Sequence, residues 1–336
     1  MVLSLLITLI TATAACIAAV FAASLHNRAF FSKVLETRRV LPGLDCGVCG
    51  YPECIDFSES IAAGEATVSG CLPGGPKTAH AVADLIGVTV EPGEPLMASV
   101  HCKGGEKEVR NRCEYQGIND CHAAILLGNS VKACHEGCLG LGSCVSVCPF
   151  GALTINRNKV AEVDRHKCTG CGTCINECPR NLIALIPHVH KIFLACNNHG
   201  SGDTVLSCCS VGCTACGNCV DSTPSGAISM VDHLPRLDYF TPNENFVAAV
   251  HSCPQKCFVD TIKVRPKANI DTKCDGCGAC IPVCPVEGAI TGRPGQRHII
   301  KKELCIGCGR CLNSCHVRAI SFWGSLGYEV HHKQKK

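Results

Sequence analysis

The chain has 336 residues, of which 32 are cysteines, one is tryptophan and four are tyrosines. A core so poor in aromatic residues needs another source of stability, and the cysteine spacings are those of metal ligands rather than of a disulfide framework. We therefore expect bound clusters to supply much of the folding free energy, while the net charge of +3 gives no indication of nucleic acid as a partner.

The first predicted element is an apolar helix that crosses a membrane. Residues 2–25 carry no formal charge, and about 20 apolar residues suffice to span a bilayer. A cleavable signal peptide is the alternative, but no basic segment precedes the apolar run. Four basic residues follow the run: Arg28, Lys33, Arg38 and Arg39. This pattern predicts a single-pass anchor over residues 1–27 in the inner (cytoplasmic) membrane, with the remaining chain on the cytoplasmic side and Cys16 as a small apolar residue.

Residues 28–90 are expected to form a small helical iron–sulfur domain. The motif C-G-V-C-G-Y-P-E-C precedes a stretch from Ile55 to Gly64 with apolar residues at helical spacing. The expected ligands of one [4Fe–4S] cluster are Cys46, Cys49, Cys54 and Cys71. Zinc is the alternative on spacing alone.

After a linker rich in proline, glycine and glutamate, six half-modules can be aligned, each a short strand, a cluster-binding turn, a short helix and another strand. They predict three tandem bacterial-ferredoxin-like modules at residues 98–190, 191–266 and 267–325, followed by a basic tail at 326–336. In such a module the fourth cysteine of each half ligates the cluster of the other half. The predicted fold class is α+β, with an N-terminal transmembrane helix, a small helical iron–sulfur domain and these three modules.

The first module has one complete and one interrupted motif. The complete motif and its crossing partners are Cys168, Cys171, Cys174, Cys178 and Cys148. The interrupted motif contains Cys138 and Cys144, with Leu141 where the middle cysteine belongs. A [3Fe–4S] cluster is one interpretation of this gap, and substitution by Cys134, one helical turn before Cys138, is the other.

The second module keeps the four ligands of one cluster and lacks those of the other. Those present are Cys213, Cys216, Cys219 and Cys253. Thr223 occupies the crossing position, and residues 239–253 contain no cysteine triplet. Because the losses all fall on one ligand set, we expect a single cluster here.

The third module has two uninterrupted motifs. Its cysteines are Cys274, Cys277, Cys280, Cys284, Cys305, Cys308, Cys311 and Cys315. Structural zinc sites use well-separated pairs of cysteines, so two triplets with two single cysteines fit zinc poorly. We expect two [4Fe–4S] clusters here.

Seven further cysteines lie outside both the apolar run and these motifs: Cys102, Cys113, Cys121, Cys196, Cys208, Cys209 and Cys257. A conservative scheme leaves them without iron and gives six clusters, with Cys134 as a substitute ligand. A fuller scheme gives eight, by adding two groups and leaving a three-ligand site. The first added group is Cys102, Cys113, Cys121 and Cys134; the second is Cys196, Cys208, Cys209 and Cys257; the three-ligand site is Cys138, Cys144 and Cys178.

The apolar N-terminal segment, the motifs C-G-V-C-G-Y-P-E-C, G-E-A and C-L-P-G-G, and the ferredoxin pairs together resemble the B subunit of the Rnf electron-transport complex, in its long multi-cluster form. The resemblance covers nearly the whole chain. It implies an ion-translocating ferredoxin:NAD oxidoreductase that pumps sodium ions or protons, within which the B subunit relays electrons. The implied partners are reduced ferredoxin and the other membrane and flavin-bearing subunits.

The sequence contains no dinucleotide-binding fingerprint, P-loop or Ser/His/Asp arrangement. We therefore expect one-electron transfer, with no catalytic residue and no hydride-transfer site in this chain. The alternatives are an iron–sulfur subunit of another membrane oxidoreductase and a stand-alone redox enzyme with a catalytic cluster.

Overall fold

The computed structural model describes residues 2–91, 93–128, 131–242 and 244–322. The expected tail at 326–336 and many side chains of residues 2–26 lie outside this description. The chain divides into an N-terminal unit of residues 1–95, to which residues 169–171 are also assigned, and a larger C-terminal unit that begins at Leu96.

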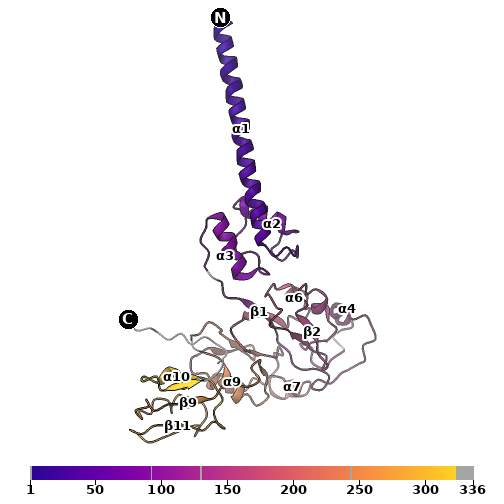
Figure 1. Cartoon of the computed structure of the whole chain (residues 1–336). Coiled ribbons are helices and arrows are strands. Elements are labelled where there is room, and N and C mark those ends of the chain that lie inside the picture. Colours follow the sequence, from indigo (N-terminus) through magenta and orange to yellow (C-terminus); the bar gives the residue numbers. More distant parts are fainter. Residues whose placement is uncertain (1, 92, 129–130, 243, 323–336) are drawn as a thin grey trace. The chain divides into compact units, whose positions relative to one another are not determined.

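The N-terminal unit consists of three helices, α1 (Val2–Val40), α2 (Cys54–Ala62) and α3 (Gly75–Ile86). Helix α1 continues through residue 27 without interruption, so the expected anchor and the start of the expected iron–sulfur domain lie on one helix (Figure 1). Among the described residues, no helix combines the length and the apolar character needed to cross a membrane.

A small apolar core joins the end of α1 to α2 and α3. Phe57, Ile61 and Val82 are buried together with Leu41, which follows α1 directly. At the start of α2 the amide of Cys54 donates to Asp45 Oδ1 over 2.7 Å, which fixes the turn that carries the cysteines. The expected helix at 55–64 is therefore present, with ends that differ by one or two residues.

The C-terminal unit repeats one arrangement of four strands three times. The first repeat has β1 (Leu96–Val100), β2 (Leu153–Ile155), β3 (Ala161–Val163) and β4 (Ile183–Pro187), with helices α4 (Cys121–Ile125), α5 (Ser143–Ser146) and α6 (Thr173–Glu177). The second has β5 (Ile192–Leu194), β6 (Ile228–Val231), β7 (Leu234–Leu237) and β8 (Phe258–Asp260), with α7 (Gly202–Leu206), α8 (Asn218–Asp221) and α9 (Val247–Ser252). The third has β9 (Ala268–Ile270), β10 (Ile290–Thr291), β11 (Ile299–Ile300) and β12 (Ile320–Phe322), with α10 (Arg310–Ser314).

In each repeat the first and last strands pair antiparallel, and the two middle strands form a hairpin. Each repeat therefore consists of two small two-stranded sheets, and its two cysteine-bearing turns connect their strands. The chain therefore mixes short helices and strands, as the predicted α+β class requires, while the module boundaries stay a prediction.

Glycine determines the shape of the cysteine-bearing turns. The φ angle of Gly276 is +77°, and a Cβ on this residue would lie 2.4 Å from the backbone nitrogen of Gln296. Gly307, in the equivalent turn, has φ +72°, and its Cβ would lie 2.5 Å from the carbonyl oxygen of Pro266. Any side chain at either position would push the turn away from its neighbour.

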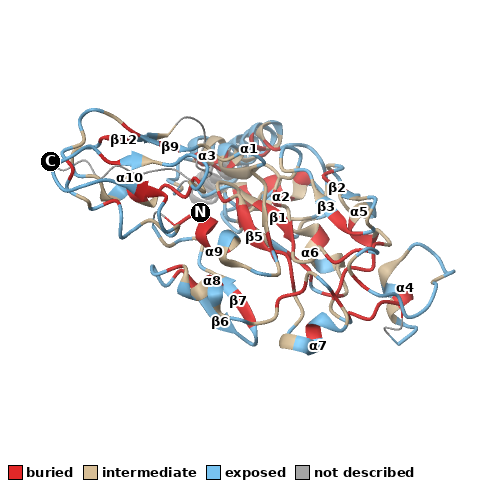
Figure 2. Ribbon diagram, turned by 90° about the horizontal axis from the view of Figure 1, so that it is seen from below, coloured by how far each residue is buried: buried red, intermediate tan, exposed pale blue. Residues whose placement is uncertain are grey.

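Buried residues occur in many short segments of the ribbon (Figure 2), and they form several clusters that contain both aliphatic residues and cysteines. The cluster of the third repeat contains the buried residues Ala268, Ile270, Cys280, Ile290, Cys311, Ala319 and Ile320. So few aliphatic groups remove little apolar surface from water, and cores of this size require additional stabilisation.

Removal of iron should therefore unfold the C-terminal unit. We expect the far-UV circular dichroism of residues 96–322 to lose most of its regular secondary structure when iron is chelated under reducing conditions, and to recover when iron and sulfide are restored. An unchanged spectrum in protein from which the iron has been removed would contradict this expectation.

Candidate metal centres

The thiols of the third repeat gather in the crossed arrangement expected from the sequence. Burial raises the pKa of Cys280, and the thiols of Cys274, Cys277 and Cys315 add to this shift. Burial likewise raises the pKa of Cys311 to about 12, and the thiols of Cys308, Cys305 and Cys284 contribute in the same direction. Each triplet is thus accompanied by the single cysteine that follows the other triplet.

In the first repeat, helix α4 supplies the thiol that the interrupted motif lacks. Burial raises the pKa of Cys144 to about 12, and the neighbouring thiols of Cys138, Cys121 and Cys178 contribute to the shift. Cys121 is the first residue of α4, and its amide donates to Ser143 Oγ over 2.7 Å. The group formed here is Cys121, Cys138, Cys144 and Cys178.

This finding differs from both sequence interpretations of the gap at Leu141. Neither interpretation included Cys121 in this group, and the Cys134 thiol contributes to the raised pKa of Cys208 and of Cys209. The loop before α4 returns the chain to the turn that begins α5, where Ser143 also donates to Asp120 Oδ2 over 3.0 Å. No local spacing rule could show that residue 121 lies beside residue 144.

The four thiols of this group line a pocket of about 410 Å³, including the solvent at its mouth. Its other walls are mainly apolar, with Val100, Leu139, Ile155, Leu182 and Ile183 among them. Four soft sulfur donors around a mainly apolar pocket suit an iron–sulfur cluster, which is held by cysteine thiolates.

A buried lysine next to this pocket indicates that the pocket holds negative charge. Lys132 is 3% exposed, and its ammonium group donates to the carbonyl oxygen of Cys138 over 2.6 Å. The described residues offer Lys132 no carboxylate partner. Burial of an ammonium group is costly unless an opposite charge lies nearby, and four metal-bound thiolates provide one.

The complete motif of the first repeat has its cysteines in the same buried cluster. Cys174 is buried there, and Cys148 and Cys168 pack against it. Cys171 lies between Cys168 and Cys174 in the sequence.

The second repeat brings together the four cysteines expected for its single cluster. Burial raises the pKa of Cys219 to about 11, and the thiols of Cys213, Cys253 and Cys216 add to the shift. These four residues line a pocket of about 330 Å³, again including the solvent at its mouth. Thr223, at the crossing position, is 2% exposed, and its hydroxyl donates to the carbonyl oxygen of Cys219 over 2.9 Å.

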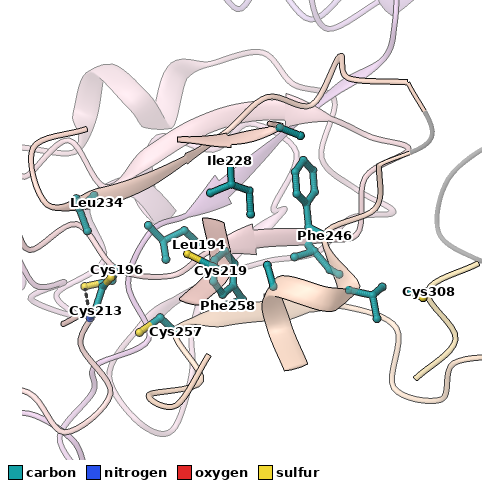
Figure 3. Close-up of a cluster of buried hydrophobic side chains, with 14 residues drawn as sticks. Leu194, Cys196, Cys213, Cys219, Ile228, Leu234, Phe246, Cys257, Phe258 and Cys308 are labelled. Carbon is teal, nitrogen blue, oxygen red and sulfur yellow. Dashed lines mark hydrogen bonds between the residues drawn. The ribbon is translucent and has the colours of Figure 1, made fainter. Parts of the chain in front are cut away.

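Aromatic packing fills the half of the second repeat that has no cysteine triplet. Phe246 is fully buried and packs near Ile228 (Figure 3). Its ring centroid lies 5.5 Å from that of Tyr239, and the His190 ring is 5.0 Å from Tyr239. A conventional core therefore stabilises this half where the other halves carry cysteines.

In the N-terminal unit, the four expected cysteines also lie together. Burial raises the pKa of Cys71, and the thiols of Cys54, Cys49 and Cys46 contribute to the increase. Cys71, which follows α2, therefore lies near Cys54 at the start of α2 and near Cys46 and Cys49 before it.

Backbone amides donate to the sulfur of several crossing cysteines. Cys148, Cys178, Cys253 and Cys315 each accept a hydrogen bond from the amide four residues later, over 3.2–3.4 Å. Such bonds stabilise negative charge on sulfur, and they are one means by which a protein sets the reduction potential of a cluster.

The remaining cysteines are grouped differently from the fuller sequence scheme. Cys134 lies with Cys196, Cys208 and Cys209. The Cys134 and Cys196 thiols both help to raise the pKa of Cys208 and of Cys209, which places them nearby. Cys257 is buried against Cys213 and Cys253 instead of joining the Cys208 group. Cys102 accepts a hydrogen bond from the amide of Cys138, while Cys113 and Cys16 are exposed.

Comparison with known proteins places iron–sulfur family matches over the cysteine-bearing segments. A family model for an iron–sulfur cluster motif matches residues 41–73. A model for a 4Fe-4S dicluster domain matches residues 273–320, and models for 4Fe-4S binding domains match residues 134–152 and 160–183. The B subunit of a Na⁺-translocating ferredoxin:NAD⁺ oxidoreductase complex from Acetobacterium woodii is 35% identical over 225 residues, which cover 67% of each chain. The chain belongs to this B-subunit family.

Two other relatives extend the comparison. The B subunit of a proton-translocating ferredoxin:NAD⁺ oxidoreductase complex from Clostridium ljungdahlii is 42% identical over 52% of this chain and 61% of its own length. The B subunit of an ion-translocating oxidoreductase complex from Methanosarcina acetivorans is 32% identical over 74% of this chain and 83% of its own length. The family predicted from the sequence is therefore confirmed.

Three residues of this B-subunit chain that contact the cysteine groups were not predicted. Lys132 and Arg180 are buried cations, and Asn198 donates to two sulfurs. Their types carry no motif, and only their nearness in sequence to Cys134, Cys178 and Cys196 could have drawn attention to them.

Replacement of Cys121 by serine tests the fourth thiol of the interrupted motif. We expect Cys121→Ser to lose one [4Fe–4S] signal, either wholly or with conversion to a three-iron cluster visible by electron paramagnetic resonance of the oxidised protein. The matched control is Cys113→Ser, in the same loop. Equal spectra of the Cys121→Ser variant and the unmodified chain would contradict the assignment.

Proposed function

We propose that this chain takes electrons from reduced ferredoxin and relays them, one at a time, to the other subunits of an ion-translocating ferredoxin:NAD oxidoreductase complex. The observation that carries the proposal is the gathering of cysteines in groups of four in a chain that belongs to the B-subunit family. The chain is an iron–sulfur electron-transfer subunit of such a complex. Its part in the reaction is to hold, bury and space the centres rather than to transfer hydride.

The proposed ligand sets are six groups of four. They are Cys46, Cys49, Cys54 and Cys71; Cys121, Cys138, Cys144 and Cys178; Cys148, Cys168, Cys171 and Cys174; Cys213, Cys216, Cys219 and Cys253; Cys274, Cys277, Cys280 and Cys315; and Cys284, Cys305, Cys308 and Cys311. A [4Fe–4S] cluster bound by such a set supplies reversible one-electron exchange. The protein contributes apolar walls that exclude water and amide hydrogen bonds that stabilise the thiolates.

Electrons are proposed to enter through the third repeat. It is the only module with two uninterrupted motifs in the sequence, and Cys277 is exposed. Between residues 267 and 322 the sequence has eight lysines and arginines against four aspartates and glutamates. This basic excess favours the docking of a small acidic electron carrier.

Helix α1 is proposed to anchor the chain in the inner membrane, with the iron–sulfur modules on the cytoplasmic side. Residues 2–25 carry no charge, and at 1.5 Å per residue such a helix is about 36 Å long, enough for the bilayer core. Ile17, Val20 and Phe21 are at least 64% exposed, so lipid would remove apolar surface from water. Because Val34 is buried where α1 ends, the helix holds the Cys46–Cys71 group close to its own end.

Ferredoxin-driven reduction tests the direction of electron flow. We expect Cys305→Ala to block reduction of the Cys46–Cys71 cluster by reduced ferredoxin, because the path loses its proposed first centre. Dithionite serves as the control, since it should still reduce that cluster in the variant. Reduction by ferredoxin at the normal rate would show that electrons do not enter through the third repeat.

Membrane topology tests the anchor. The mature protein should retain residues 2–25, and protease added to intact cells should not cleave the modules. We expect Ile17→Asp with Val20→Asp to release the separately expressed chain from membranes, because each carboxylate at the bilayer centre costs about 3 kcal/mol. The control is Ile17→Leu with Val20→Leu. A mature N-terminus near residue 24, or cleavage from outside, would refute the topology.

A further inference from the structure

Four cysteines outside the six proposed ligand sets lie together between the first and second repeats. We call Cys134, Cys196, Cys208 and Cys209 the bridging site. Cys134 and Cys209 are buried in one cluster, against which Cys208 packs. The Cys196 thiol is near enough to add to the increase that burial causes in the pKa of Cys209. Cys134, Cys196 and Cys209 are buried, and Cys208 is half-buried.

Hydrogen-bond donors point at three of the four sulfurs. Asn198 Nδ2 lies 3.5 Å from Cys134 Sγ and 3.6 Å from Cys208 Sγ. The orientation of this amide is fixed, because its oxygen accepts from the amide of Gly200 over 2.8 Å. The amide of Cys213 donates to Cys196 Sγ over 3.3 Å (Figure 3). Sulfurs that accept hydrogen bonds in this way are characteristic of cluster ligands.

Positive charge and close packing also favour thiolates at this position. Arg180 is 7% exposed, and its Nη1 donates to the carbonyl oxygens of Cys134 and Gly137, each over 3.1 Å. Its guanidinium group therefore lies against the loop that carries Cys134. Gly104 leaves room for the Cys209 sulfur, since a Cβ at residue 104 would approach Cys209 Sγ to 2.9 Å.

We propose that the bridging site binds an additional [4Fe–4S] cluster, held by one cysteine of the first repeat and three of the second. The proposal rests on the proposed function, because it adds a seventh centre to the same relay. Cys134 is four residues before Cys138, and Cys196 touches Cys213, so the site adjoins ligands of a proposed centre in each repeat. An electron that moves between the repeats then reduces one centre as it oxidises its neighbour, and no bond is made or broken.

Iron, sulfide and zinc analysis of the full chain, reconstituted without oxygen, tests the proposal. Seven sites predict about 28 irons per chain, and Cys196→Ser with Cys209→Ser should lower the content to about 24. The matched control is Cys16→Ser with Cys113→Ser, because both cysteines are exposed and belong to none of the proposed ligand sets, so the iron content should stay near about 28. An equal iron content in the Cys196/Cys209 variant and the unmodified chain, or zinc in place of iron, would overturn the proposal.

A variant that keeps every thiol provides a second test. Asn198→Leu removes the hydrogen bonds to two sulfurs, so one reduction midpoint should move to lower potential while the iron content is unchanged. A redox titration identical to that of the unmodified chain would count against the bridging site. If the chain binds about 24 irons and still accepts electrons from ferredoxin, the bridging site fails and the proposed function stands. If ferredoxin reduces none of its clusters, the proposed function fails.

Discussion

The physical constraint on which the structure depends is the burial of thiols in groups that suit metal coordination. Burial raises the pKa of Cys144 and of Cys311 to about 12, so neither group ionises by itself near neutral pH. A metal converts such a thiol to a thiolate and makes its burial favourable. Because these sulfurs belong to the small cores, we expect cluster binding and folding of each repeat to be one process.

Positive charge is distributed unevenly around the cysteine groups. Lys132 and Arg180 lie buried beside the groups of the first repeat, where they favour electron-rich states of bound clusters. In the third repeat, the charge of Arg310 lowers the pKa of Cys308, although burial raises it more strongly. Arg310 also contacts Glu244 Oε2 at 3.3 Å, so the same side chain joins the third repeat to the second. Electrostatics therefore contributes to both the energy and the placement of the centres.

The second repeat shows what is required when a cluster is lost from this fold. Phe246, Tyr239 and His190 pack together, and buried Glu244 accepts hydrogen bonds from the amides of Asn245 and Phe246. An aromatic core and a satisfied buried carboxylate replace the metal as the source of order. The backbone consequently keeps its strand pairing, with β5 against β8 and β6 against β7, although only one of the two ligand sets is present.

The sequence by itself determined the regular part of this protein. Triplet spacing and the glycines of the turns predicted the crossed grouping of Cys280 with Cys315 and of Cys284 with Cys311, because these positions are set by a local turn and a repeated strand length. The tertiary structure decided the irregular part. Cys121 reaches Cys144 through a long loop, and Cys134 lies with cysteines of the next repeat. Spacing along the chain cannot reveal such contacts, since they depend on how a loop folds back and how two repeats pack.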